Sequence, residues 1–259
     1  MSLNPRLASW QDRRVWIVGA SSGIGLALAE HLLAAGALLA VSARKTAALD
    51  VLASRHPGRV EVLALDVTSA GDWEAAHAAL QRRWEAVDHF IFCAADYQPV
   101  RAWELDAARA ARMVDTNLTG ALRGVACVLP AMLARGAGHV ALVASVAGYM
   151  GLPKSLVYGP TKAALINFAE ALYLDVHPRG VGVSVINPGF VDTPLTKQND
   201  FAMPALLTPA EAAAEIAAGL AAGRFEIHFP RRFTTWLRLI RRLPYGLKFR
   251  VLAEVAKKS

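Results

Sequence analysis

The sequence has few cysteines and few aromatic residues. Its two cysteines, Cys93 and Cys127, are too few for a disulfide framework and lack the spacing of metal ligands, so we expect reduced thiols and no metal site. Aromatic residues make up 8% of the 259 residues, whereas apolar residues make up 54%, so Ala, Leu and Val supply most of the core. Such a composition excludes a disordered chain. The length suits one large α/β domain or two small ones.

The chain also lacks a long uninterrupted apolar run. Residues 1–14 include Pro5, Arg6 and Asp12 and have no continuous apolar stretch, so they do not resemble a signal peptide. The longest stretch without Asp, Glu, Lys or Arg, residues 136–153, is interrupted by Gly, Ser, His and Pro. A buried strand followed by a loop explains that stretch better than a membrane span. We therefore expect a cytoplasmic protein.

The body of the chain has little net charge. The overall charge is +7, but residues 231–259 contain nine basic side chains and only one acidic one. Residues 1–230 are left with 19 basic and 20 acidic groups. Because the excess is confined to the C-terminal end and no nucleic-acid-binding motif accompanies it, we expect no nucleic acid partner.

Short apolar segments alternate with longer helical patterns. The segments predicted to be strands are residues 15–18, 38–42, 60–65, 89–93, 140–144 and 181–186, with a last edge strand at 223–228. The predicted helices are residues 23–35, 46–55, 69–84, 102–135 and 156–177, and we expect 102–135 to be two helices broken near 115–117. The strands are apolar throughout, as strands covered on both faces are. This alternation predicts an α/β fold with a doubly wound parallel sheet, in which ligands bind at the carboxyl ends of the strands.

A glycine-rich turn follows the first predicted strand. It runs Gly19-Ala20-Ser21-Ser22-Gly23-Ile24-Gly25 and opens a helix rich in Ala and Leu. Glycine permits a tight turn and a close approach of the backbone to a pyrophosphate, and the helix start offers free N–H groups. Many glycine-rich turns are only turns, but its position between a strand and a helix favours a dinucleotide site.

A tyrosine and a lysine occur four residues apart, in Tyr158-Gly159-Pro160-Thr161-Lys162. On a helix both side chains share one face. A phenol is a poor base at neutral pH, but a nearby ammonium favours the phenolate, as an oxidised nicotinamide would. Pro160 is tolerated only in a first helical turn, which places Tyr158 near the helix start and close to the edge of the sheet. The pair is therefore a candidate for proton transfer to or from a carbonyl or alcohol.

These motifs and their order resemble the short-chain dehydrogenase/reductase family over residues 14–230. The resemblance implies a Rossmann-like sheet of seven strands in the order 3-2-1-4-5-6-7. It also implies that Tyr158 is the acid/base, that Lys162 tunes it and binds ribose, that Ser145 orients the substrate and that Asn117 supports a water relay. Taken singly, Tyr158, Ser145 and Asn117 could be a core residue, a turn residue and a helix cap.

The resemblance also implies a set of cofactor-binding positions. NAD-binding members carry an acid at the end of the second strand, but this chain has Ala43 followed by Arg44, which implies NADP(H) rather than NAD(H). Arg44 could equally be a solvated residue at a helix start. The implied cofactor-binding residues are Gly19, Ser21, Ser22, Gly23, Ile24, Gly25, Arg44, Asp66, Val67, Ala94, Asn117, Tyr158, Lys162, Pro188, Gly189, Val191 and Thr193. Phe92-Cys93-Ala94-Ala95 departs from the family's Asn-Asn-Ala-Gly and puts the local hydrogen bonding in question.

Two apolar segments correspond to the pocket wall and lid of relatives. The implied substrate-pocket residues are Tyr149, Leu152, Leu195, Phe201 and Met203. Because these side chains carry no fixed charge, they indicate an apolar carbonyl or secondary alcohol as substrate. The nearby charges Lys197 and Asp200 are expected to be solvated.

The basic C-terminal end forms an amphipathic pattern. Apolar residues at Phe233, Trp236, Leu237, Ile240 and Leu243 follow helical spacing, with Arg238, Arg241 and Arg242 on the other side. We therefore divide the chain into a catalytic domain, residues 1–230, and a helical extension, residues 231–259. The apolar stripe packs on the domain or on a subunit partner, or it lies on an anionic membrane surface with Phe233 and Trp236 inserted.

Together the motifs predict an NADP(H)-dependent oxidoreductase that interconverts a carbonyl and a secondary alcohol by hydride transfer. Relatives are usually homodimers or homotetramers, which the resemblance implies here. The alternative is a catalytically idle protein that binds NADP(H) as a regulatory ligand. The complete set of Asn117, Ser145, Tyr158 and Lys162 argues against that alternative.

Overall fold

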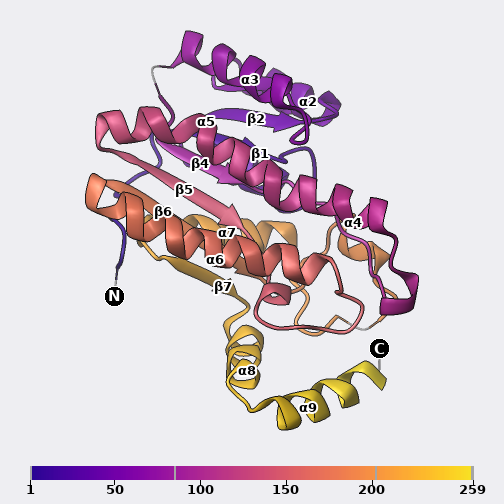
Figure 1. Cartoon of the computed structure of the whole chain (residues 1–259). Helices are drawn as coiled ribbons and strands as arrows, with labels where there is room; N and C mark the ends of the chain where they lie inside the picture. Colours follow the sequence, from indigo (N-terminus) through magenta and orange to yellow (C-terminus); the bar gives the residue numbers. More distant parts are fainter. Residues whose placement is uncertain (1, 85, 202, 258–259) are drawn as a thin grey trace.

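A seven-stranded parallel sheet forms the centre of the molecule. The computed structural model describes residues 2–84, 86–201 and 203–257. The strands are β1 Arg14–Val18, β2 Leu38–Ala43, β3 Val60–Ala64, β4 His89–Phe92, β5 Gly138–Val143, β6 Val181–Pro188 and β7 Glu226–Phe229. They pair in the order β3-β2-β1-β4-β5-β6-β7, which confirms the predicted doubly wound Rossmann-like sheet (Figure 1).

Helices cover both faces of this sheet. The helices are α1 Gly23–Ala34, α2 Ala47–Arg55, α3 Ala70–Arg83, α4 Ala107–Val114, α5 Gly120–Arg135, α6 Tyr158–Val176, α7 Pro209–Ala221, α8 Arg231–Arg241 and α9 Tyr245–Lys257. Short turns of helix are η1 Ala102–Glu104, η2 Asp115–Thr119, η3 Val146–Gly148, η4 His177–Arg179 and η5 Thr196–Gln198. The core on one face holds side chains of α3, α5 and α6, and the core on the other holds side chains of α1, α2 and α7. This coverage explains why the strands are apolar throughout.

Aromatic packing ties α3 and α5 to the sheet. Trp16 and Phe90 lie side by side on neighbouring strands and contact Trp73 of α3, with ring centroids 5.5 to 6.3 Å apart. A Cβ at Gly124 of α5 would lie 2.5 Å from Phe90 and 2.6 Å from Trp73. The small residue therefore lets α5 approach the sheet closely, which sets the position of the residues that precede it.

The predicted division near residues 115–117 is confirmed in position, because α4 ends at Val114 and α5 begins at Gly120, but the chain between them stays helical. The helix continues from residue 107 to 135 through one turn of π-helix, η2, because a wider turn absorbs the bend without ending the helix. This stretch is long and apolar enough to cross a bilayer by length and composition alone. Val125, Val128 and Met132 are nevertheless buried in the core, so it packs as a core helix of the α/β body.

Helix α7 is not among the helices predicted from the sequence, which assigns apolar residues from Leu195 to Met203 to the pocket and lid and no element between them and the edge strand at 223–228. A capping box was present to find it: Thr208 accepts from the backbone N–H of Glu211, and the Glu211 side chain accepts from that of Thr208. Pro209 in the first turn is a further start signal. The helix packs beside α1 and completes the second core.

Candidate active site

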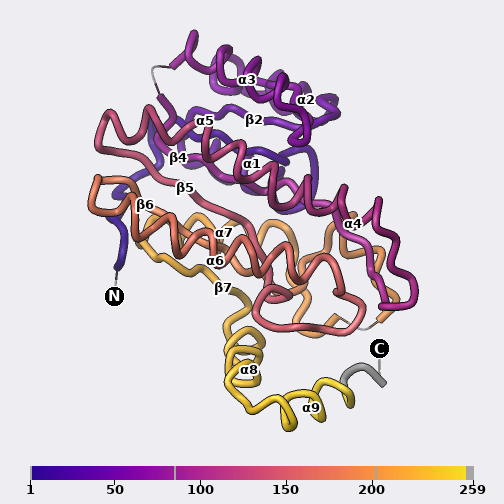
Figure 2. Tube along the Cα trace, viewed as in Figure 1, coloured from indigo at the N-terminus to yellow at the C-terminus, as the bar shows by residue number. Residues whose placement is uncertain are grey.

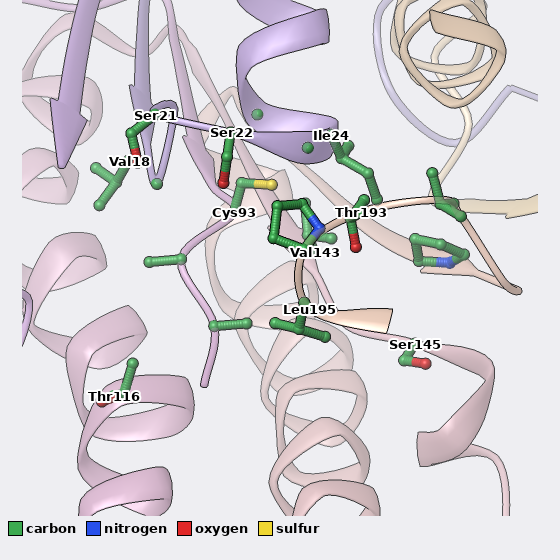
Figure 3. Close-up of a pocket in the computed structure, with 18 of the residues that line it drawn as sticks. Val18, Ser21, Ser22, Ile24, Cys93, Thr116, Val143, Ser145, Thr193 and Leu195 are labelled. Atoms are coloured by element: carbon green, nitrogen blue, oxygen red, sulfur yellow. The ribbon is translucent and has the colours of Figure 1, made fainter. Parts of the chain in front are cut away.

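A cleft of about 300 Å³ lies at the carboxyl ends of the strands, as expected for this fold (Figure 3). The loops after β1, β2, β4, β5 and β6 contribute to its wall together with the first turns of α1 and α6. Most of the residues predicted to bind cofactor line it: Gly19, Ser21, Ser22, Gly23, Ile24, Gly25, Arg44, Val67, Ala94, Tyr158, Lys162, Pro188, Gly189, Val191 and Thr193. Segments that lie far apart in the sequence are thus brought together at one site.

The glycine loop leaves no room for side chains. A Cβ at Gly25 would lie 2.2 Å from the carbonyl oxygen of Gly19, and one at Gly19 would lie 2.4 Å from the Ala94 nitrogen. Gly19 also has a φ of +89°, in the left-handed region. Helix α1 starts at this loop. The Ser22 side chain makes no capping hydrogen bond there, and the first turn of the helix contains no acidic residue. Its N–H groups and positive dipole end fit a phosphate group of a dinucleotide.

The end of β2 presents a basic side chain to the cleft. Ala43 is buried, whereas Arg44 is exposed at the rim, and no carboxylate in the described part of the chain forms an ion pair with it. Asp66 lies after β3, where its Oδ1 accepts from the backbone N–H of Thr68 at 3.0 Å and from its hydroxyl at 2.8 Å. Within the chain, the Asp66 side chain therefore caps the turn that follows β3.

Ser145, Tyr158 and Lys162 meet at the opposite end of the cleft. Ser145 caps the η3 turn after β5, and Tyr158 begins α6. A Cβ at Gly148 of η3 would lie 2.7 Å from the Lys162 backbone, so the turn rests directly on α6. The contact brings the Ser145 hydroxyl into hydrogen-bonding distance of the Tyr158 hydroxyl. Lys162 is buried, and its Nζ donates to the Val143 carbonyl oxygen at 2.9 Å.

Burial shifts the pKa values of both Tyr158 and Lys162. Burial raises the pKa of Tyr158, and the hydrogen bond from Ser145 offsets only part of that rise. Burial also lowers the pKa of Lys162 to about 8. The Lys162 Nζ lies 5.5 Å from the Tyr158 ring centroid, within the range at which an ammonium stabilises a phenolate. Tyr158 is therefore protonated at neutral pH and is equipped to donate a proton.

Asn117 connects helix α6 to the segment that follows β4. It is fully buried on the π turn η2, where its Oδ1 accepts from the Asp96 backbone N–H at 2.6 Å. Its Nδ2 donates to the Asp96 carbonyl at 2.9 Å and to the Thr161 hydroxyl at 3.1 Å. The side chain thus ties the segment after β4 to α6. These bonds supply part of the local hydrogen bonding that the departure at residues 92–95 puts in question.

Comparison with known proteins agrees with this geometry. The family model described as short chain dehydrogenase matches residues 13–203. The chain belongs to this family. An uncharacterized oxidoreductase from Myxococcus xanthus is 33% identical over 244 residues, which cover 93% of this chain and 96% of the relative. The protein is thus an oxidoreductase of the short-chain dehydrogenase family.

Solved structures of short-chain dehydrogenases share the fold. One from Streptomyces avermitilis superposes with a TM-score of 0.82 at 26% identity, covering 95% of this chain and 96% of that one. A 3-ketoacyl-(acyl-carrier-protein) reductase from Brucella melitensis, solved with NADH, has a TM-score of 0.78 at 24% identity and covers 86% of this chain and 99% of that one. The first of these supports the family and the second the fold.

The structure adds residues that the sequence analysis did not assign to the site. Cys93 lines the cleft at the end of β4, and Figure 3 shows its sulfur directed into the same space as Ser22 and Thr193. Burial raises the pKa of its thiol to about 11, so it is an apolar wall residue. Tyr97 packs edge-on against Tyr158, with centroids 4.9 Å apart. Both follow β4, and their position at a strand end was the signal available in the sequence.

The predicted substrate residues are placed in different ways. Leu195 lines the cleft, whereas Tyr149, Leu152, Phe201 and Met203 do not. Phe201 contacts Phe190 at 5.8 Å, and the Met203 sulfur accepts from the Asn199 side chain at 3.3 Å. Asp200 is not simply a solvated charge, because Lys154 pairs with it at 2.5 Å. That ion pair connects the segment after η3 to the segment after η5.

Tyr149 anchors the turn that holds Ser145. Its hydroxyl donates to Glu226 Oε1 of β7 at 2.6 Å, and the Asn187 side chain donates to the same oxygen at 3.0 Å. Arg238 of α8 lies 3.4 Å from the other oxygen of Glu226. Arg238 therefore contacts the body of the protein although its side chain is 43% exposed. Glu226 joins the turn after β5, the edge strand β7 and helix α8.

We expect Tyr149→Phe to lower the free energy of unfolding by about 1–2 kcal/mol, because Glu226 loses a donor in a partly buried site. Urea denaturation followed by circular dichroism measures the change. Tyr245→Phe, which alters a tyrosine that is 71% exposed, serves as the control. An unchanged urea midpoint for Tyr149→Phe would show that this bond does not hold the turn.

Proposed function

We propose that the protein is an NADP(H)-dependent enzyme that interconverts an apolar carbonyl compound and its secondary alcohol. The observation that carries the proposal is the meeting of Ser145, Tyr158 and Lys162 at one end of a cleft whose other end is formed by the glycine loop and Arg44. A bound nicotinamide supplies or accepts the hydride in this chemistry.

The residues of the chain have separate tasks in the proposed reduction. Ser145 and Tyr158 donate hydrogen bonds to the carbonyl oxygen of the substrate and hold it at the open end of the cleft. As hydride reaches the carbonyl carbon, Tyr158 transfers its phenolic proton to that oxygen, so that the product is a neutral alcohol. Protonated Lys162 stabilises the resulting phenolate. Since the pKa of Tyr158 is raised, the phenol carries the proton at neutral pH that the reduction requires.

An apolar substrate is supported by the side chains around this end of the cleft. Leu195 and Val143 line it, and Tyr97 packs on the catalytic tyrosine. No described carboxylate, lysine or arginine other than Lys162 and Arg44 lines the cleft, so a charged substrate would find no partner near Ser145. We further propose a cytoplasmic homodimer or homotetramer.

A panel of apolar aldehydes and ketones, with NADPH oxidation followed at its absorbance maximum, tests the proposal. Turnover of at least one carbonyl by the native protein is expected, with NADPH preferred over NADH. An inactive protein that still binds NADPH would instead support the idle, regulatory alternative.

The cofactor preference rests on Arg44. Arg44→Ala is expected to weaken NADPH binding by about tenfold or more and to leave NADH binding nearly unchanged, because only NADPH carries the 2′-phosphate that the guanidinium would bind. Fluorescence titration of both cofactors measures the two dissociation constants. Lys45→Ala, the exposed neighbour, is the matched control. Tighter binding of NADH than NADPH by the native protein would contradict the assigned role.

A further inference from the structure

We propose that α8 and α9 form a binding surface for anionic membranes. The two helices follow the edge strand β7 and project from the body (Figures 1 and 2). We call residues 231–254 of this pair the basic arm. The sedimentation test below requires no substrate, so the binding does not rest on the proposed enzymatic activity.

One side of α8 is fixed to the protein. Leu237 and Ile240 are buried, and Phe233 contacts Phe190 of the loop after β6, with ring centroids 5.7 Å apart. Thr234 is also buried, and its hydroxyl lies 2.7 Å from His228 Nδ1. Packing on the domain therefore accounts for part of the predicted stripe, and Phe233 is not available for insertion into a bilayer.

The other side of the arm leaves large apolar side chains in solvent. The described part of the chain has fourteen exposed large apolar residues, and five of them fall within residues 236–249. These five are Trp236, Leu239, Tyr245, Leu247 and Phe249. Scattered single residues of this kind need no explanation, but five within two adjoining helices indicate a contact surface. Because packing on the body already uses another side of α8, this surface requires a different occupant.

The charge of the arm identifies that occupant. Exposed basic residues alternate with the exposed apolar ones: Arg231, Arg232, Arg238, Arg241, Arg242 and Arg250, with Lys248 half-buried. Glu254 is the only acidic residue of the arm. Tryptophan, tyrosine and phenylalanine beside arginine and lysine are the composition of helices that lie in the headgroup region of a bilayer with anionic lipids. A second copy of the same surface would bring like charges together.

The basic arm is linked by aromatic contacts to the loop after β6. Phe233 of α8 packs on Phe190, and Phe190 packs on Phe201, which belongs to the segment beside the substrate end of the cleft. A membrane-bound arm would therefore hold the loops around the cleft close to the bilayer. An apolar carbonyl dissolved in lipid could then reach the site without crossing bulk water.

Sedimentation with vesicles tests the proposal on the full-length protein. The native protein is expected to sediment with vesicles of equimolar phosphatidylcholine and phosphatidylglycerol, to bind phosphatidylcholine alone much more weakly, and to dissociate as salt is raised. Arg241→Gln with Arg242→Gln should weaken binding on the order of twentyfold, since two basic groups near the surface are lost. Trp236→Ser with Phe249→Ser should weaken it about tenfold or more.

A matched control distinguishes insertion of the arm into the bilayer from nonspecific binding of any exposed tryptophan to vesicles. Trp103 is 78% exposed on η1, against 49% for Trp236, so Trp103→Ser removes an exposed tryptophan outside the arm and should leave vesicle binding unchanged. Melting temperatures close to that of the native protein would verify that each variant is folded. Equal sedimentation of the Trp236/Phe249 variant and the native protein would overturn the proposal.

The competing occupant, a second copy of the chain, has its own signature. In that case the native protein would not sediment with anionic vesicles, and the Trp236/Phe249 variant would have a smaller mass than the native protein in analytical ultracentrifugation. This result would also overturn the proposal. Either failure would leave NADPH-dependent turnover intact, so the two proposals are tested separately.

Discussion

Tyr158→Phe is expected to lower kcat for carbonyl reduction by about 10² to 10⁴-fold, the usual contribution of a positioned general acid. The substitution removes the phenolic proton beside Ser145 and keeps the ring that packs on Tyr97. Steady-state kinetics with the best substrate of the panel measure the loss. Because the ring remains, the affinity for NADPH should change little.

Tyr173→Phe is the appropriate control for this result. Tyr173 lies on the same helix, α6, and its hydroxyl donates to the Leu3 carbonyl at 2.8 Å. Neither Tyr173 nor Leu3 lines the cleft. Its removal should leave kcat unchanged. If Tyr158→Phe retained native turnover, both the assignment of the acid and the proposed reductive chemistry at this site would be wrong.

Acid is expected to destabilise the protein through two histidines near the amino ends of β4 and β5. His89 and His139 stack with ring centroids 5.5 Å apart, and the His139 Nε2 lies 2.9 Å from the Ser184 hydroxyl. Burial lowers the pKa of His139 to about 3 and that of His89 to about 4. Both rings are therefore neutral in the folded protein well below the pH at which free histidine becomes charged.

The sign of the effect follows from proton linkage. An unfolded histidine has a pKa near about 6.5, so below that pH the unfolded chain binds protons that the folded protein excludes. The stability contributed by the neutral rings is present above about pH 6.5 and is lost as the pH falls toward their folded-state values. At about pH 5, His139 alone should cost about 2 kcal/mol, and His89, which is partly exposed, should cost less.

Urea denaturation at about pH 7 and about pH 5 measures this loss. His139→Gln should reduce the difference between the two pH values by about 2 kcal/mol, whatever its effect on stability at neutral pH. His31→Asn, which removes an exposed histidine of α1, should leave the difference unchanged. Equal acid sensitivity of His139→Gln and the native protein would contradict the assignment of the acid effect to this pair.

The sheet was predictable because its signals are local. Each strand is a short apolar run between helical patterns, and a parallel sheet with crossovers of one hand has few ways to arrange them. The glycine loop and the Tyr158–Lys162 spacing were equally readable, since each motif depends on neighbours within a few residues. Helix α7 was missed although its capping box was visible, because the apolar residues before it were interpreted as a lid.

Other features depend on contacts that no local pattern contains. Glu226, for example, pairs with Tyr149 and with Arg238, which belong to separate elements of the fold. The direction of the Tyr158 pKa shift likewise depends on burial by the surrounding segments. Burial is the clearest case. The sequence places Lys162 one helical turn from Tyr158, but only the folded environment shows that both side chains are buried and that burial raises the pKa of the phenol and lowers that of the amine.

The sequence by itself therefore determined the family, through that resemblance the order of the strands, the candidate proton-transfer residues and the confinement of the positive charge to the C-terminal end. Only the tertiary structure decided which side of that end packs on the body and which remains exposed with its arginines. The reason is physical. Periodicity along a helix specifies that an apolar stripe exists, whereas the surface that covers it is specified by contacts between segments far apart in the sequence.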